Sequence, residues 1–143
     1  MHLIRAVEDH SDRIAASAIE EIQRNSRLKH LRSLPHAELA GWAGRILGSI
    51  ASDLEPEERQ KLGRRHEEMG HLRFTEGVPL HESVLGMQIL KNQVIDFVRK
   101  QDQPRDMMEL YSEEELERQI VHFFDFLLYH TVAGYEKGWA DTQ

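Results

Sequence analysis

A histidine on the apolar face of a long predicted helix is the residue best placed to do chemistry in this chain of 143 residues. Residues spaced alternately four and three apart stay on one face of a helix. The stripe near the C-terminus with this spacing is Leu116, Ile120, Phe123, Leu127, His130 and Gly134. An imidazole on an apolar face can bind a ligand, or it can be neutral in the core with one hydrogen bond to a backbone carbonyl, Tyr129 or Thr131.

A second histidine, His66, shares a predicted helix face with Leu62, Met69 and Arg73. If that helix packs against the C-terminal one, His66 and His130 lie across one pocket. We therefore predict a ligand pocket formed by His66, Met69, Phe123, Leu127 and His130.

Haem and metal binding are the cofactor alternatives, and no cofactor is the main expectation. In a globin-like fold, His130 can ligate haem iron in a pocket lined by Phe123, Phe124 and Leu127. A carboxylate and a histidine three residues apart, such as Asp125 and His122, bind a metal when another helix supplies matching ligands. We expect no metal site.

Catalysis has no recognisable signature in the chain. It contains no cysteine, which excludes thiolate chemistry and disulfides, and Ser83 and Ser112 stand in no nucleophile motif. We predict that the protein is not an enzyme and has no catalytic residues. The net charge of −7 argues against binding nucleic acid.

The length of the chain predicts one domain, residues 1–143. The first ten residues carry charges every few positions and lack the apolar core of a signal peptide. No apolar run approaches the length that spans a bilayer. These features predict a cytoplasmic protein without membrane insertion.

Helical periodicity recurs along the chain, and alternation of period two is absent. We predict helices over about 3–25, 36–53, 55–77, 79–100 and 112–140. The fold class is therefore all-α, with about five helices arranged as a globin-like fold or a helical bundle, between which periodicity does not decide.

The predicted helix ends rest on capping residues. Ser112 and Glu115 form a capping-box pattern at the start of the last helix, and Ser33 is placed to cap the helix that begins at His36. Gly77 is predicted to end its helix in the left-handed region, with Pro79 in the first turn of the next.

The polar connection over 101–111 contains Pro104. Within it, we expect a short turn packed on the core, formed by Met107, Met108 and Leu110.

Two segments carry a resemblance to a known family. Residues 70–84 read GHLRFTEGVPLHESV, and residues 123–136 read FFDFLLYHTVAGYE. The first resembles the central segment of the RsbT co-antagonist (RsbRD) N-terminal domain family, which has a glycine and then an apolar-Pro-Leu-x-Glu helix start. The second is similar to the last helix of members found ahead of bacterial histidine kinases, and the resemblance spans about residues 5–138.

The resemblance implies an all-helical sensory domain, related in shape to globins, that usually precedes a kinase, a STAS domain or another output domain. We expect a non-catalytic bacterial input domain, either excised from a longer protein or acting through a separate partner. The signal would pass along the last helix through Tyr135 and Trp139 to a histidine kinase or other output partner. The alternatives are a haem-binding gas or redox sensor and a small carboxylate–histidine metalloprotein.

A homodimer is expected through the first and last helices. The first helix carries a second apolar set, Leu3, Ala15 and Ile19, beside its core stripe. Trp139 near the chain end adds apolar surface that a second copy can cover.

Overall fold

The computed structural model describes residues 2–101 and 106–143, and within them all regular secondary structure is helical, with no strand. Seven α-helices and two short 3₁₀ helices make up the described part. Their bounds are α1 His2–Asp9, α2 Ser11–Arg24, η1 Leu31–Ser33, α3 His36–Gly48, α4 Ile50–Asp53, η2 Pro56–Glu58, α5 Arg59–Thr75, α6 Leu80–Arg99 and α7 Met107–Asp141. The all-α prediction is confirmed for these residues.

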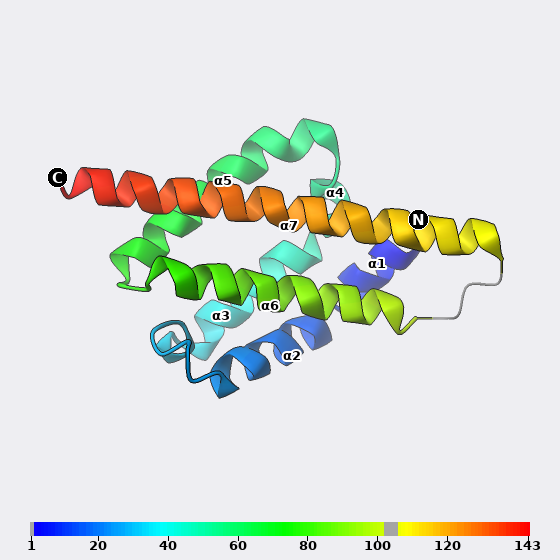
Figure 1. The fold of residues 1–143 in the computed structure, drawn as a ribbon, viewed down its shortest axis with the longest axis horizontal. Coiled ribbons are helices and arrows are strands. Elements are labelled where there is room, and N and C mark those ends of the chain that lie inside the picture. The colour runs from blue at the N-terminus through cyan, green and yellow to red at the C-terminus, as the bar shows by residue number, and fades with distance from the viewer. Residues whose placement is uncertain (1, 102–105) are drawn as a thin grey trace.

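The long helix α7 runs the length of the molecule, antiparallel to α6 (Figure 1). Helix α5 packs most extensively against α7, and α6 packs against both α7 and α2. Helix α2 packs against α6, α3 packs against α2, and α1 packs against α2, α3, α4 and α6. Every helix therefore reaches α7 directly or through one or two neighbours.

The predicted stripe on α7 faces the core as expected, with one exception. Leu116, Ile120, Phe123 and Leu127 are buried, whereas the His130 side chain is one-fifth exposed. Thr131 is buried at that level in its place, and its hydroxyl donates to the carbonyl of Leu127. After Leu127, the next buried residue on this face is therefore Thr131, four residues on, and not His130, three residues on. A helix of 3.6 residues per turn allows either step.

The predicted first helix is kinked at His10 into α1 and α2. His10 has φ −109° and ψ 20°, and its Nδ1 lies 2.9 Å from the carbonyl oxygen of Ala6, four residues earlier. A side chain that bonds a carbonyl of its own helix competes with the backbone and bends the helix. Backbone bonds from Arg13 and Ile14 to the carbonyl of His10 carry the chain into α2.

The predicted second helix breaks at Ser49 into α3 and α4. The Ser49 Oγ lies 3.0 Å from the Arg45 carbonyl oxygen, again four residues earlier, and 2.7 Å from the buried carboxylate of Asp53, so its one proton is shared between two acceptors. The break frees backbone amides at the start of α4, and Glu8 on α1 accepts from the amide of Ala51 at 2.9 Å. Both additional breaks therefore involve side-chain bonds to the backbone, which leave the apolar periodicity unchanged.

Helix α7 begins at Met107, five residues before the predicted start. The side chain of Asp106 accepts from the amide of Glu109 at 2.9 Å, so the cap lies at Asp106 and the predicted capping box at Ser112 is wrong. Asp106 and Glu109 have the same spacing as Ser112 and Glu115. Sequence spacing therefore did not separate the two candidate caps.

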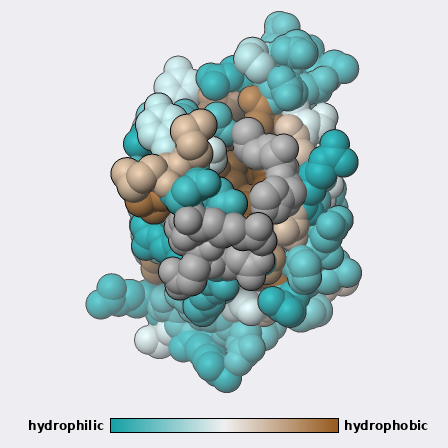
Figure 2. Space-filling model, turned by 90° about the vertical axis from the view of Figure 1, so that its right-hand side faces the viewer, coloured by the Kyte–Doolittle hydropathy of each residue, from teal (hydrophilic) through white to brown (hydrophobic). Residues whose placement is uncertain are grey.

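The predicted core-packed turn before α7 is also wrong. Met107 and Met108 belong to the first turn of α7 and are 77% and 76% exposed, and Leu110 is exposed as well. Figure 2 views this end of the molecule, where apolar atoms lie at the surface among hydrophilic ones. Pro104, which we placed in this connection, lies outside the described residues.

Two other expectations from the sequence are corrected. Ser33 does not cap α3, because its hydroxyl donates to the carbonyl of Lys29 within the preceding turn. Ala15 and Ile19 are buried inside the chain and Leu3 packs against the same core. The second apolar set of the first helix is therefore covered without a second copy.

The turn between α5 and α6 has the predicted left-handed glycine. Gly77 has φ +80°; its amide bonds the carbonyl of Phe74, and the amide of Val78 bonds that of Arg73. This pair of bonds is the Schellman arrangement. Helix α6 begins at Leu80, with Pro79 at its N-cap rather than in its first turn.

No helix in residues 2–101 and 106–143 combines the length and apolar composition needed to cross a bilayer.

Gly77 offers a clean test of backbone strain, because a Cβ there would meet no atom within 4 Å. We expect Gly77→Ala to lower the free energy of unfolding by about 1–2 kcal/mol, the cost of the left-handed region for a residue with a Cβ. Gly44→Ala is the matched control. It too has open space, but it lies inside α3, so it should raise stability by about 0.5–1 kcal/mol. Urea denaturation of both variants measures the two signs, and equal effects would contradict the turn assignment.

Candidate functional site

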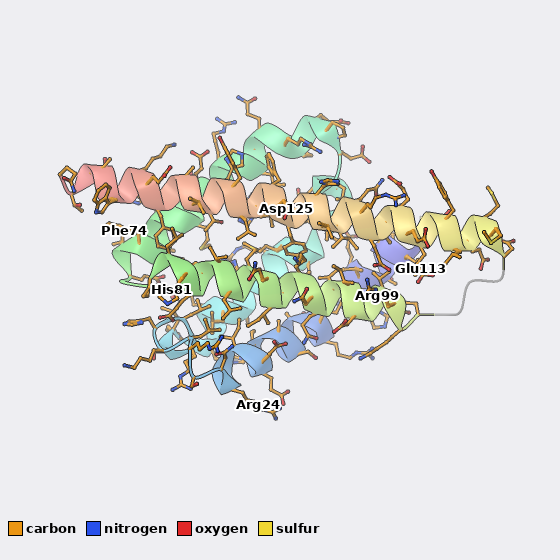
Figure 3. The ribbon with its side chains drawn as sticks, viewed as in Figure 1. Arg24, Phe74, His81, Arg99, Glu113 and Asp125 are labelled. Atoms are coloured by element: carbon orange, nitrogen blue, oxygen red, sulfur yellow. The ribbon has the colours of Figure 1, made fainter. Side chains whose placement is uncertain are left out.

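The seam between α5 and α7 is closer than side chains normally allow. A Cβ added at Gly70 would lie 2.1 Å from the carbonyl oxygen of Thr131, and one added at Gly134 would lie 2.0 Å from that of Glu67. Further along, Gly138 lies against Phe74, which Figure 3 labels beside α7. Only glycine permits this approach of two helix backbones. The seam brings the predicted site residues of α5 and α7 next to one another.

His130 lies at the edge of this seam. Its ring packs over Gly63, where an added Cβ would come within 2.9 Å of it. Its Nδ1 lies 2.6 Å from Oε2 of Glu67, so its partner is a carboxylate rather than a backbone carbonyl, Tyr129 or Thr131. Lys137 also donates to Glu67. These bonds from Lys137 and His130 lower the pKa of Glu67 despite the opposing effect of burial. Haem ligation by His130 stays a prediction.

His66 is the more deeply buried histidine, at 5% exposure. Burial, with smaller effects of the charges on Arg65 and His130, lowers the pKa of His66 to about 4. Its Nδ1 has no hydrogen-bond partner among the described residues. A neutral imidazole therefore sits in the core beside the seam, on the face predicted for it.

The five residues of the predicted pocket do not line one described cavity. Phe123 lines a large cleft, Met69 lines a small internal cavity of about 20 Å³, and the other three line neither. Leu127 is fully buried in the core. A binding pocket shared by these five residues stays a prediction.

A buried arginine lies near them, and the sequence did not assign it a role. Arg73 is 3% exposed; its Nη1 donates to Glu38 on α3 and, at 2.8 Å, to Glu76. The pKa of Glu38 is lowered, first by a hydrogen bond with Glu76 and then by the hydrogen bond and charge of Arg73. The pKa of Glu76 is raised, first by burial and then by its hydrogen bond with Glu38. This trio ties α3 to the end of α5. Its only sequence signal was the apolar face that Arg73 shares with His66.

Tyr135, predicted to pass a signal along the last helix, is buried and anchors α7. Its hydroxyl donates to the carbonyl of Val78 at 2.8 Å. Because that proton is used, the Ser83 hydroxyl donates to Tyr135 across 2.6 Å. Trp139, one turn further on, is 63% exposed. The final turns of α7 thus combine a fixed aromatic residue with a free one.

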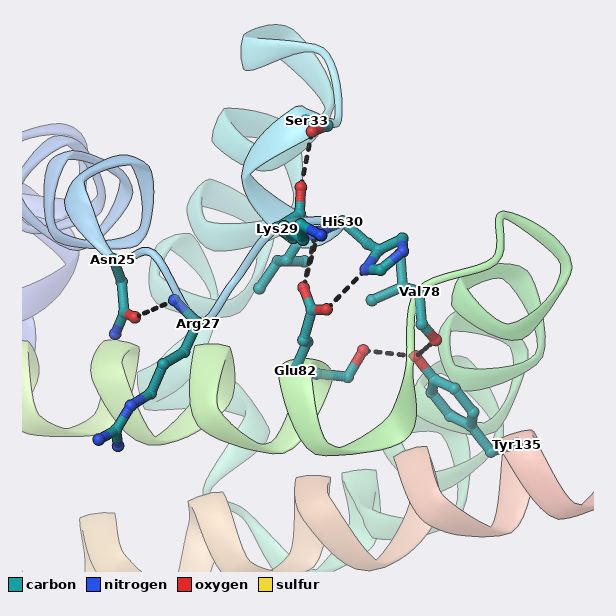
Figure 4. Close-up of polar contacts among 10 residues, drawn as sticks. Asn25, Arg27, Lys29, His30, Ser33, Val78, Glu82 and Tyr135 are labelled. Carbon is teal, nitrogen blue, oxygen red and sulfur yellow. Dashed lines mark hydrogen bonds and ion pairs between the residues drawn. The ribbon is translucent and has the colours of Figure 1, made fainter.

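The Val78–Glu82 motif that carried the family resemblance is a structural junction (Figure 4). The buried carboxylate of Glu82 accepts from the backbone amides of His30 and Leu31, at 2.9 Å each, and lies 2.7 Å from the ring Nδ1 of His30. Burial alone would raise the pKa of Glu82, but the bonds from Leu31 and His30 outweigh it and lower the pKa. The motif therefore joins the α2–α3 connection, α6 and α7.

A cleft of about 900 Å³ opens beside the seam, and sequence patterns did not predict it. Four parts of the chain line it, namely α1, the α4–η2 segment, the start of α5 and the middle of α7. The α4–η2 segment and the start of α5 are contiguous, so three stretches far apart in sequence meet here only after folding, which is why periodicity did not reveal the cleft. No group of three or more potential metal ligands occurs among residues 2–101 and 106–143.

The seam predicts a large penalty for any side chain at Gly134. We expect Gly134→Ala to lower the free energy of unfolding by about 3 kcal/mol, because backbone must move to admit the Cβ. Gly44→Ala, with open space around it, is again the matched control. Chemical denaturation measures both, and a Gly134→Ala loss no larger than the Gly44→Ala effect would contradict the close seam.

His66 predicts an acid-dependent loss of stability. Its folded pKa of about 4 lies below the ordinary 6.5, so the unfolded chain takes up the proton first as the pH falls. Its contribution is complete above pH 6.5 and is lost progressively down to about pH 4. The advantage of His66→Leu over the natural chain should grow by about 3 kcal/mol between pH 7 and pH 4. Urea denaturation at several pH values measures this, with the exposed His36→Gln as control, and a constant difference would contradict it.

Comparison with known proteins leaves the geometry as the basis for assigning a function. No family model, curated protein or solved structure matches this chain.

Proposed function

We propose that the chain is a non-catalytic regulatory input domain in which occupancy of the cleft changes the packing of α7. The observation that carries the proposal is the position of α7, a helix of 35 residues. Its middle lines the cleft through Gln119, His122, Phe123 and Phe126, and its end presents the exposed Trp139. One rigid element therefore connects a cavity with a free surface.

The seam favours a discrete change in packing over a gradual one. Gly70 and Gly134 bring backbone against backbone, so there is no flexible side chain between the helices to absorb a small displacement. Closely packed interfaces tend to switch between alternative arrangements rather than deform continuously. A ligand that contacts α5 and α7 together would favour whichever arrangement fits it better.

Two polar connections hold α7 in the arrangement described. Tyr135 bonds to Val78 and Ser83 at the α5–α6 turn, and Glu67 bonds His130 and Lys137 across the seam. Exchange between packings would have to break or remake these bonds. Side-chain bonds of this kind are worth about 1 kcal/mol each, so ligand contacts can offset their loss.

The partner and the family belong to the same proposal. The segments similar to RsbRD domains support a bacterial sensory module of globin-like arrangement that acts on a histidine kinase or another output partner. Tyr129 and Trp139, 71% and 63% exposed on α7, offer a contact for that partner or for a second copy in a homodimer. The partner contact and the homodimer contact are therefore both proposed on α7 alone, because the second apolar set of the first helix is covered within the chain.

The proposal can be tested before any ligand is known. The chain has no cysteine, so Ser52→Cys places a single thiol in the wall of the cleft. Modification with N-benzylmaleimide then fills the cleft with an aromatic group. We expect backbone amides of residues 131–141 to change their hydrogen-exchange rates by roughly fivefold or more, the lower range of allosteric coupling.

Ser26→Cys with the same reagent is the matched control, because Ser26 is exposed after α2 and outside the cleft. It should leave exchange in α7 unchanged. Unaltered exchange over residues 131–141 in the modified Ser52→Cys protein would overturn the proposed coupling. An equal change in both labelled proteins would do the same.

A further inference from the structure

The floor of the cleft is apolar. Ile4 on α1, Leu62 on α5, and Phe123 and Phe126 on α7 all line it. Ile4, Leu62 and Phe123 are also members of the buried core. A cavity of several hundred cubic ångströms with an apolar floor is typical of a site for a small organic molecule.

The carboxylates at the rim are largely occupied by the protein. Glu8 accepts from the amide of Ala51. Asp53, 5% exposed, accepts from the Ser49 hydroxyl at 2.7 Å and lies 3.6 Å from Arg65. These two carboxylates already accept hydrogen bonds from residues at the start of α4, so they are poorly available to a cationic ligand.

Two arginines at the same rim have no ion pair among the described residues. Arg5 lies on α1 and Arg59 begins α5, and both line the cleft. The guanidinium carbon of Arg59 lies 5.6 Å from the centre of the Phe126 ring, a cation–π contact that holds the charge beside the apolar floor. Glu55 is the remaining lining carboxylate and is exposed. Glu8 and Glu55 keep their negative charges, so the rim carries both signs, and the two guanidinium groups supply its unoccupied charged N–H donors.

We propose that the cleft binds a small organic anion, with its apolar body on the Phe123–Phe126 floor and its acidic group between Arg5 and Arg59. Guanidinium groups bind carboxylate, sulfonate or phosphate through paired N–H donors. Gln119 and His122, on the α7 wall of the cleft, add polar groups for the rest of such a molecule. The inference deepens the proposed function, on which its regulatory meaning rests, while the binding itself can be measured separately.

Two dyes of similar aromatic shape test the assigned chemistry. 8-Anilinonaphthalene-1-sulfonate carries a fixed negative charge, and N-phenyl-1-naphthylamine carries none. We expect saturable fluorescence enhancement of the anionic dye at one site per chain. Modification of Ser52→Cys with N-benzylmaleimide should abolish it, whereas modification of Ser26→Cys should not. Persistence of the signal after the cleft is filled would place the dye elsewhere and overturn the inference.

The charge is tested by Arg59→Gln. Its affinity for the anionic dye should fall by roughly tenfold, the loss of one charge-assisted interaction, with little change for the neutral dye. Arg64→Gln is the matched control: it removes the same charge from an exposed position on the same helix that does not line the cleft. An equal loss for both dyes in Arg59→Gln would show that Arg59 acts only by packing on Phe126, and would overturn the anion assignment.

The outcomes separate the ligand from its consequence. Binding of the anionic dye in the cleft without altered exchange at residues 131–141 would support the ligand class and overturn the coupling to α7. Altered exchange in the modified Ser52→Cys protein, with no saturable binding of the anionic dye, would support the coupling and overturn the ligand class. Thermal unfolding of each variant, followed by circular dichroism, establishes that the dyes meet folded protein.

Discussion

Direct contact between the backbones of α5 and α7 is the constraint on which the rest of the molecule depends. Gly70 faces the carbonyl of Thr131, and Gly134 faces that of Glu67, with no room for a Cβ at either glycine. This approach seats His130 over Gly63 and turns it toward Glu67. Near the C-terminal end of α7, Tyr135 reaches the α5–α6 turn. The cleft is lined in part by both helices of this fixed pair, and the junction at Glu82 is joined to α7 through Tyr135.

Apolar periodicity was sufficient to predict the helical class and most of the core. It reports which residues face inward, and the stripe from Leu116 to Leu127 is buried as predicted. It does not report where a backbone bends, because the breaks at His10 and Ser49 involve single side-chain bonds to carbonyls four residues earlier. Nor does it choose between two similar caps, as at Asp106 and Ser112. Gly77 was predictable because a left-handed position has a strong preference for glycine.

The site was less predictable than the fold, and for a different reason. That His66 faces the core follows from spacing within one helix, whereas the partner of His130 depends on a residue 63 positions away in the sequence. The buried charge of Arg73 is compensated by Glu38 from α3, a pairing that no local pattern reveals. The cleft is still harder to predict from sequence, since its walls come from three separate segments. At the site, the sequence therefore predicted that His66 is buried, but it did not predict the hydrogen-bond and ion-pair partners of His130 and Arg73.

The bonds of Tyr135 and Glu82 also bear on the order in which the chain can fold. Tyr135 meets Val78 across 57 residues, and Glu82 meets Leu31 across 51. Contacts between positions so distant require large loops to close first, and such closure slows folding relative to local helix formation. Individual helices can therefore form early, while the junction at Glu82 and the seam along α7 are completed late. The close backbone contact of the seam therefore joins parts of the chain that only a large loop closure can bring together.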